Sequence, residues 1–186
     1  SNQKGIKVIK TFVESGDLKL NKIIQEKKNN LSGNPLYDHI FLREKIEEDF
    51  FNFYLENTKD KSNSIFKKNG YSSSQVFLDE IKKLKPHLLI VYGSSVIKGE
   101  ILNLYKNKIL NVHLGLSPYY KGSGTNYFTL VNNEPEYFGA TFMFLDQTID
   151  GGKIIHQIRP KIYYKDNIHQ IGNRLIVEMF KVYKDL

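Results

Sequence analysis

The chain has 186 residues, of which 40% are hydrophobic and 25% are charged, and its formal net charge is +7. This length and composition are typical of one soluble globular domain with a real core. Cysteine is absent, which excludes disulfides, cysteine nucleophiles and cysteine-bound metals and fits a cytoplasmic protein. No apolar run is long enough to cross a membrane, and the first residues are not a signal peptide because no apolar segment follows the first lysines.

The positive charge is dispersed along the chain. Lysines occur in pairs and short clusters, and no block of five or six like charges is present. A solvated, lysine-rich surface is therefore expected, with no specific nucleic-acid partner and no membrane partner. A basic balance also suits a small phosphorylated substrate.

The first half of the chain carries weakly patterned segments separated by polar loops. In chain order, the pattern predicts a helix over 4–15, a strand over 20–25, a polar loop over 27–37, a charged helix over 41–55, a second polar loop over 57–64 and a serine-capped helix over 74–84. A doubly wound α/β fold usually opens on a strand, whereas this chain opens on a predicted helix. Two interpretations stay open: the first strand of the fold is missing, or the first residues are a frayed end.

The second half has a sharper pattern, in which strands and helices alternate. It predicts strands over 87–93, 108–113, 137–146 and 153–160, and helices over 97–105, over 124–131 and after Asp166, which is the expected cap. The run "HLLIVYG" is continuously apolar, which is typical of a strand buried on both faces. No hairpin turn separates the first two strands, so a parallel pair with a right-handed crossover is predicted. Residues 1–186 are expected to form a single α/β domain with a mainly parallel sheet flanked by helices.

Polar side chains follow three of these predicted strands. Asn111 and His113 lie two residues apart at the end of a strand, so their side chains should point to the same side. Residues 93–97 follow the preceding strand, and Asp150 lies after strand 137–146 beside two glycines that permit a close backbone approach. Because ligands collect at the carboxyl ends of parallel strands, we expect an amide, an imidazole and a carboxylate to share one site. Such groups are able to bind a carbonyl oxygen and to move a proton.

Three other interpretations of these residues were weighed. A serine hydrolase would use Ser94 or Ser95 as its nucleophile, but the second glycine of a nucleophile elbow is absent. A metal site would use His113 and Asp150, but no further ligand stands at metal-binding spacing, so no metal is predicted. In the simplest alternative, His113 is a structural residue at a strand end and Asp150 is a turn residue.

The segments "NVH", "GLSP" and "DGG", with Gly122 before the last of them, resemble the motifs of one family in order and spacing. These are the folate-dependent formyltransferases, which include glycinamide ribonucleotide formyltransferase, the catalytic domain of methionyl-tRNA formyltransferase and the sugar N-formyltransferases. "KPHLLIVYGSSVI" is similar to the strand and loop that precede the motif in that family. The resemblance covers residues 84–160 and implies a Rossmann-like formyltransferase fold.

The resemblance also implies a role for each matching position. Asn111 matches the residue that binds the formyl oxygen, and His113 the residue that stabilises the tetrahedral intermediate and assists proton transfer. Asp150 matches the residue that keeps this histidine cationic and orders a water. The positions that match the folate-binding loops are Ser95, Val96, Ile97, Leu145, Asp146, Gln147, Thr148 and Ile149. Two positions depart from the family pattern: Gly115 stands where serine is common, and Ser117 where leucine is common.

The expected activity is the transfer of a formyl group from 10-formyltetrahydrofolate to a primary amine. The acceptor is expected to be a small molecule, phosphorylated or linked to a nucleotide, which the positive charge suits. Transfer RNA is disfavoured because the sequence ends after the predicted helix of the catalytic domain. Two alternatives stay open: a formyltetrahydrofolate hydrolase, and a folate- or nucleotide-binding domain without turnover.

Overall fold

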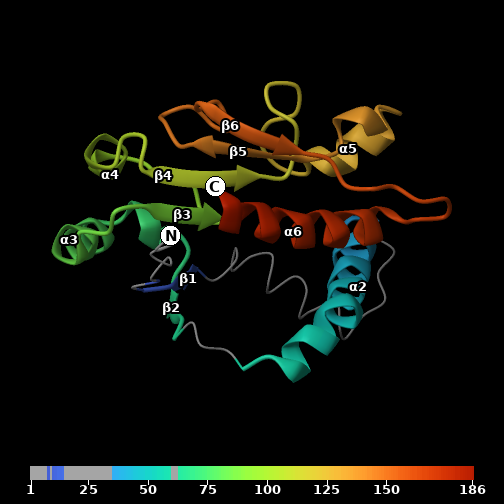
Figure 1. The fold of residues 1–186 in the computed structure, drawn as a ribbon, viewed down its shortest axis with the longest axis horizontal. Coiled ribbons are helices and arrows are strands. Elements are labelled where there is room, and N and C mark those ends of the chain that lie inside the picture. The colour runs from blue at the N-terminus through green and yellow to red at the C-terminus, as the bar shows by residue number, and fades with distance from the viewer. Residues whose placement is uncertain (1–7, 9, 15–34, 60–62) are drawn as a thin grey trace, which may run out of the picture.

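The computed structural model describes residues 8, 10–14, 35–59 and 63–186, so the strand expected over 20–25 lies outside the described residues. The elements in chain order are β1 (Phe12–Glu14), α2 (Pro35–Asn57), β2 (Ile65–Lys67), η1 (Tyr71–Ser73), α3 (Gln75–Leu84), β3 (Leu89–Tyr92), α4 (Glu100–Leu104), β4 (Ile109–His113), α5 (Thr125–Val131), η2 (Pro135–Tyr137), β5 (Ala140–Phe144), β6 (Ile154–Ile158) and α6 (Ile168–Asp185). Helices and strands alternate along most of the chain, which confirms the α/β class (Figure 1).

The described strands form a mixed sheet rather than the mainly parallel one that was expected. Four strands lie in the order β3-β4-β5-β6, and β1 pairs with β2 in a separate two-stranded sheet. The β1–β2 and β3–β4 pairs are parallel, whereas β5 runs antiparallel to β4 and β6 antiparallel to β5. The reason is the connection after β4, which turns back at the same end of the sheet, so that Thr141 near the start of β5 pairs with His113.

The prediction of a helix over 4–15 was wrong at β1. The Phe12 ring packs against Tyr71 and Phe77, with centroids 5.6 Å and 5.7 Å apart, so its burial comes from these contacts and not from a helical stripe. β2 was not predicted either, because three residues are too few to display a period of two. Residues 12–14 therefore form a strand and not a helix. The interpretation that the first strand of the fold is missing rested on a predicted initial helix, so it loses that support.

Side chains of β4 alternate between two hydrophobic clusters. Leu110 and Val112 pack with α6, whereas Ile109 packs with the apolar faces of α3 and α4. Figure 1 shows α6 running along the sheet, with α2 on the side of α6 away from β4. Asn111 and His113 share the face of Ile109, because residues two apart in a strand point the same way. Both polar side chains therefore lie on the face of the sheet opposite α6.

Two further expectations need correction. β3 was expected to be buried on both faces, but it is an edge strand of the four-stranded sheet, and Ile90 and Tyr92 are 52% and 40% exposed. Asp166 was expected to cap the last helix. The cap is instead Asn167, whose side chain accepts hydrogen bonds from two backbone N–H groups of α6, while Asp166 pairs with Arg174 at 2.9 Å. Among the described residues, no helix combines the length and apolar character that crossing a bilayer requires.

Candidate active site

His113 is the centre of the candidate site. It ends β4 and is 8% exposed. Its Nδ1 lies 3.3 Å from Oδ2 of Asp150, and its Nε2 lies 2.9 Å from the carbonyl oxygen of Tyr120. A carboxylate and a carbonyl only accept hydrogen bonds, so each ring nitrogen has a partner for an N–H group. The His113 ring is therefore held between the carboxylate of Asp150 and the carbonyl of Tyr120.

Asp150 reaches His113 by a route that the sequence analysis did not predict. Because β5 is antiparallel to β4, the loop after Phe144 starts at the end of the sheet far from His113, where Leu145 N donates to Ile109 O at 2.9 Å. The loop then runs back to the rim where β4 ends. The carboxyl ends of β3 and β4 therefore meet at one edge of the sheet, as expected. Asp150 does not follow a strand end at this edge and is brought there by the returning loop.

The two glycines after Asp150 allow this return. A Cβ on Gly152 would lie 1.8 Å from the carbonyl oxygen of Phe144, and one on Gly151 would lie 2.3 Å from the Thr148 hydroxyl. Neither position has room for a side chain. Asp150 itself adopts a left-handed conformation, with φ of 47°. The loop therefore packs tightly against the strand it has just left and turns sharply at the carboxylate.

Two hydrogen bonds fix Asp150. Gly122 N donates to Oδ2 of Asp150 at 2.9 Å, and the Ser117 hydroxyl donates to the Asp150 carbonyl at 3.2 Å. Both donors belong to the loop after β4. The carboxylate is thus held from the same segment that carries His113 at its start.

A row of polar side chains crosses the sheet behind the site and holds that loop. Thr141 pairs with His113 in the sheet, and Gln157 pairs with Thr141. The Thr141 hydroxyl donates to Gly115 O at 2.7 Å and accepts from Ser117 N at 3.0 Å. Gln157 Nε2 donates to Ser117 O at 2.8 Å and to the Thr141 hydroxyl at 3.0 Å. Thr141 and Gln157 were not predicted from the sequence, although a polar residue within an apolar strand was a usable signal.

Gly115 is required by the position of the His113 ring. A Cβ at residue 115 would lie 2.6 Å from His113 Nε2 and 2.7 Å from the Thr125 hydroxyl. That hydroxyl donates to the carbonyl of Leu114. Thr125 therefore occupies space that a serine at position 115 would need, which accounts for one departure from the family pattern.

Asn111 supplies an unengaged amide. It is half-buried on β4, on the same face as His113, and its side chain makes no hydrogen bond to any of the described residues. An amide in this position is able to donate to a ligand oxygen beside the imidazole. Among the described residues, no group of three or more histidine or acidic side chains is placed to hold a metal ion.

Comparison with known proteins decides the family. The family model for formyl transferases matches residues 43–185, which include His113, Asp150 and the loops around them. The chain belongs to the formyl transferase family. The resemblance inferred from "NVH", "GLSP" and "DGG" is thereby confirmed.

Curated relatives of this formyl transferase chain include methionyl-tRNA formyltransferases. The protein from Desulforamulus reducens is 36% identical over 101 residues, which are 53% of this chain and 31% of the relative. The protein from Finegoldia magna is 32% identical over 108 residues, which are 57% of this chain and 34% of the relative. The match thus spans about a third of the length of these relatives.

Solved structures show the same fold. Glycinamide ribonucleotide transformylase 1 from Geobacillus kaustophilus has a TM-score of 0.56 and 17% identity, covering 94% of this chain and 93% of its own. The formyltransferase PseJ from Anoxybacillus kamchatkensis, solved with a UDP-linked formamido sugar and tetrahydrofolate, has a TM-score of 0.54 and 17% identity, covering 95% and 73%. These similarities confirm the Rossmann-like formyltransferase fold.

The first loop matching the family's folate-binding positions is anchored at both ends. Ser95 N donates to Glu14 at 2.9 Å, and the Ser95 hydroxyl lies 3.1 Å from that of Ser72. Ile97 is buried in the cluster that contains Ile109. Val96 is 55% exposed. Ser95 and Ile97 therefore fix the loop, and Val96 is its exposed apolar side chain.

The second loop is arranged in the same way. Leu145 packs on the same cluster as Ile97. Asp146 accepts hydrogen bonds from the hydroxyl and N–H of Thr148, and these bonds lower the pKa of Asp146 below its usual value. Gln147 and Ile149 are exposed, the latter by 64%. Each loop thus has one exposed apolar side chain, Val96 in the first and Ile149 in the second.

Proposed function

We propose that the chain is the catalytic part of an enzyme that moves the formyl group of 10-formyltetrahydrofolate to a primary amine. The observation that carries the proposal is the pairing of His113 with Asp150 at 3.3 Å, next to the unengaged amide of Asn111. The family, the fold and the two loops with Val96 and Ile149 support it. The single catalytic domain and the cytoplasmic location expected from the sequence stay predictions.

The reaction needs an oxyanion to be stabilised and one proton to be moved. The acceptor nitrogen attacks the formyl carbon, and negative charge develops on the formyl oxygen. Asn111 donates to this oxygen, and the cationic His113 lies beside it. The acceptor nitrogen then loses a proton, the folate nitrogen gains one, and the bond between that nitrogen and the formyl carbon breaks. The products are a formamide and tetrahydrofolate, so atoms and electrons balance without a covalent enzyme intermediate.

The two polar contacts of the His113 ring differ in length and kind: Nε2 makes a hydrogen bond, and Nδ1 makes an ion-pair contact. The contact of Nε2 with Tyr120 O measures 2.9 Å, whereas the contact of Nδ1 with Asp150 measures 3.3 Å. In this proposal the longer contact is shared with a water or with the acceptor during proton transfer. Asp150 then acts by holding a positive charge on His113 and by placing the proton-carrying water.

The acceptor is proposed to be an amine attached to a nucleotide. The curated relatives are methionyl-tRNA formyltransferases, and the PseJ structure holds a UDP-linked formamido sugar. The expectation against transfer RNA rested on where the sequence ends. It carries no weight here, because the match spans only about a third of those relatives. Small nucleotide-linked amines and the aminoacyl end of transfer RNA both remain candidates.

One kinetic experiment separates the proposed activity from its alternatives. Release of tetrahydrofolate from 10-formyltetrahydrofolate is measured with and without an amine panel that includes a nucleotide-linked amino sugar and methionyl-tRNA. Amine-dependent release that His113→Ala abolishes supports the transferase. Release that is independent of every amine identifies the hydrolase. Binding of a stable folate analogue without any release identifies a domain without turnover.

A further inference from the structure

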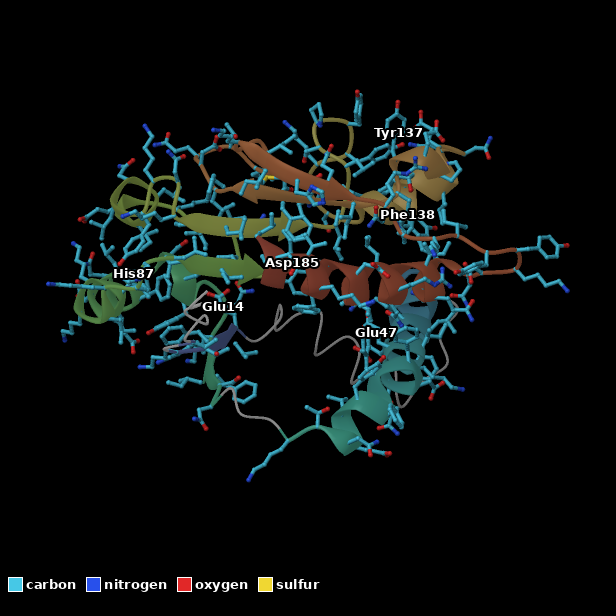
Figure 2. The ribbon with its side chains drawn as sticks, viewed as in Figure 1. Glu14, Glu47, His87, Tyr137, Phe138 and Asp185 are labelled. Atoms are coloured by element: carbon cyan, nitrogen blue, oxygen red, sulfur yellow. The ribbon has the colours of Figure 1, made fainter. Side chains whose placement is uncertain are left out.

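Three tyrosine rings line an open hollow that shares Tyr120 with the surroundings of the candidate active site. Tyr119 and Tyr120 follow the Ser117–Pro118 turn, and Tyr137 ends η2, beside α5 in Figure 2. The Tyr137 ring centroid lies 4.7 Å from that of Tyr119 and 6.0 Å from that of Tyr120. The hollow has a volume of about 370 Å³ and is also lined by Asn132 and Glu134. We call it the tyrosine hollow.

The tyrosine hollow presents aromatic faces to solvent. Tyr119 is 68% exposed although its ring stacks at a tilt on Tyr137. Exposed aromatic rings next to a concave surface offer a platform on which a planar ligand stacks.

The polar groups of the hollow are mostly acceptors. The Tyr120 hydroxyl donates to one carboxylate oxygen of Glu134 and accepts from Asn132 Nδ2 at 3.0 Å. The bond to Glu134 raises the pKa of Tyr120, so this hydroxyl stays protonated. Among the described residues, the second oxygen of Glu134 and the amide oxygen of Asn132 receive no hydrogen bond. A ligand in the hollow therefore meets two acceptors and should supply N–H donors.

The charge of the hollow makes it a poor site for a phosphate group. Glu134 lines it, and Glu136 belongs to the same short helix as Tyr137. The cation of the neighbouring Lys121 instead acts on Asp146, whose pKa it helps to lower. An anion in the hollow would face carboxylates, whereas a neutral ring with N–H groups would not.

The hollow is joined directly to the candidate catalytic residue. The Tyr120 side chain lines the hollow, and the Tyr120 carbonyl lies 2.9 Å from His113 Nε2. Tyr120 thus connects the hollow, through its side chain, with the proposed catalytic histidine, through its carbonyl.

We propose that the tyrosine hollow binds a nucleobase of the formyl acceptor, stacked on the Tyr119 and Tyr137 rings, with its N–H groups donated to Glu134 and Asn132. Stacking on exposed aromatic rings tolerates any base. This inference rests on the proposed function and narrows it. A nucleotide-linked sugar and the end of a transfer RNA both carry a base, whereas phosphoribosylglycinamide, the substrate named for several proteins of this fold, carries none.

The test measures binding of free nucleosides. Adenosine, guanosine, cytidine and uridine are titrated by nuclear magnetic resonance, with inorganic phosphate as a second probe. Nucleosides should bind, and phosphate should not compete with them. Tyr119→Ala should weaken nucleoside binding about 5- to 150-fold through lost stacking. Glu134→Gln keeps the shape of the side chain but removes its charge. It should weaken binding most for the nucleosides whose bases carry exocyclic amino groups.

The matched control is Tyr164→Ala, which removes a tyrosine that is 92% exposed and does not line the hollow. Equal binding in wild type, Tyr119→Ala and Glu134→Gln, or no nucleoside binding at all, would overturn the inference. Amine-dependent formyl transfer without nucleoside binding would refute only the proposal that the tyrosine hollow binds a nucleobase. Nucleoside binding without formyl transfer would refute only the proposed function. Transfer to a nucleotide-linked amino sugar or to methionyl-tRNA, each lost in Tyr119→Ala, identifies the source of the base.

Discussion

The Ser117 hydroxyl donates a hydrogen bond to the Asp150 carbonyl at 3.2 Å and so joins the loop after β4 to the loop after β5. The backbone of Ser117 is also fixed by hydrogen bonds to the sheet, because its N–H donates to the Thr141 hydroxyl and its carbonyl accepts from Gln157. Ser117 is one of the two departures from the family pattern. It adds a link to the loop that carries the carboxylate facing His113.

Asn111→Ala tests the oxyanion donor. Removing one such donor typically lowers turnover by about 100- to 1,000-fold. Because the Asn111 amide makes no hydrogen bond to the described residues, its loss should leave the melting temperature nearly unchanged. Steady-state rates and thermal melts on one preparation check both statements. An unchanged turnover number in a folded variant would remove Asn111 from the mechanism.

His113→Ala and Asp150→Asn test the proton-carrying pair. Loss of a general acid–base residue typically lowers rates by about 100-fold or more. Asp150→Asn keeps the shape but removes the negative charge next to Nδ1. The pair acts as a unit, so the double variant should be no slower than the slower single variant. Multiplying losses in the double variant would show that the two residues act independently.

Thr141 should act on both stability and turnover. Thr141→Val keeps the shape but leaves Ser117 N without its acceptor and Gly115 O without its donor, which costs about 1–3 kcal/mol of unfolding free energy. Turnover should fall as well, because the loop holding Asp150 loses a support, and Thr141→Ser should restore both.

The control for this prediction is Thr129→Val. Thr129 is also fully buried, but its hydroxyl bonds within α5, to Asn126 O at 2.8 Å. This variant should lower stability and leave turnover per folded molecule unchanged. Equal turnover losses in Thr129→Val and Thr141→Val would show that stability alone explains them.

Gly115→Ala should displace the His113 ring. The added Cβ would lie 2.6 Å from Nε2 and 2.7 Å from the Thr125 hydroxyl, closer than contact distance, so the ring must leave its present position. We expect turnover to fall strongly while folate binding persists. Gly172→Ala in α6 is the matched control, because nothing lies within 4 Å of its new Cβ. It should stabilise the helix by about 0.5–1 kcal/mol without changing the rate.

Glu14 predicts a pH dependence of stability. Burial raises the pKa of Glu14, but hydrogen bonds from Ser95 and Ser72 outweigh this effect and bring the pKa below the ordinary value of 4.5. A carboxyl group with a lowered pKa stabilises the folded state above its ordinary pKa and loses this contribution as the pH falls through the folded value.

The measurement is a series of chemical unfolding curves between neutral pH and pH 3. Glu14→Gln should be less stable than wild type at neutral pH, and the gap should narrow as the pH falls below 4.5. A gap that stays constant over this range would show that the Glu14 charge contributes nothing.

The sequence was sufficient for β4 and for the side chains at its end. Strand periodicity places Asn111 and His113 on one face whatever the direction of neighbouring strands, so this prediction needed no knowledge of topology. Asp150 was found by its match to the family motif, and the structure places it 3.3 Å from His113. Local pattern and family resemblance together supplied the three candidate catalytic residues.

The direction of β5 could not be predicted from the sequence. An apolar strand has the same period in a parallel and in an antiparallel pair, and the long connection after β4 gives no turn signal. The prediction of the α6 cap failed for another reason. Asp166 and Asn167 are both good capping residues, but Asp166 pairs with Arg174 and Asn167 forms the cap. Such outcomes depend on tertiary partners that lie far away in the chain.

The returning path from Phe144 to Asp150 makes the length of this loop part of the chemistry. The loop bends and turns over residues 147–150, so removing one residue between Leu145 and Asp150 would change where the carboxylate is placed. The carboxylate would then be misplaced relative to His113, although all three candidate catalytic residues would still be present. Insertions and deletions in this loop should therefore be as rare among active relatives as substitutions of Asp150.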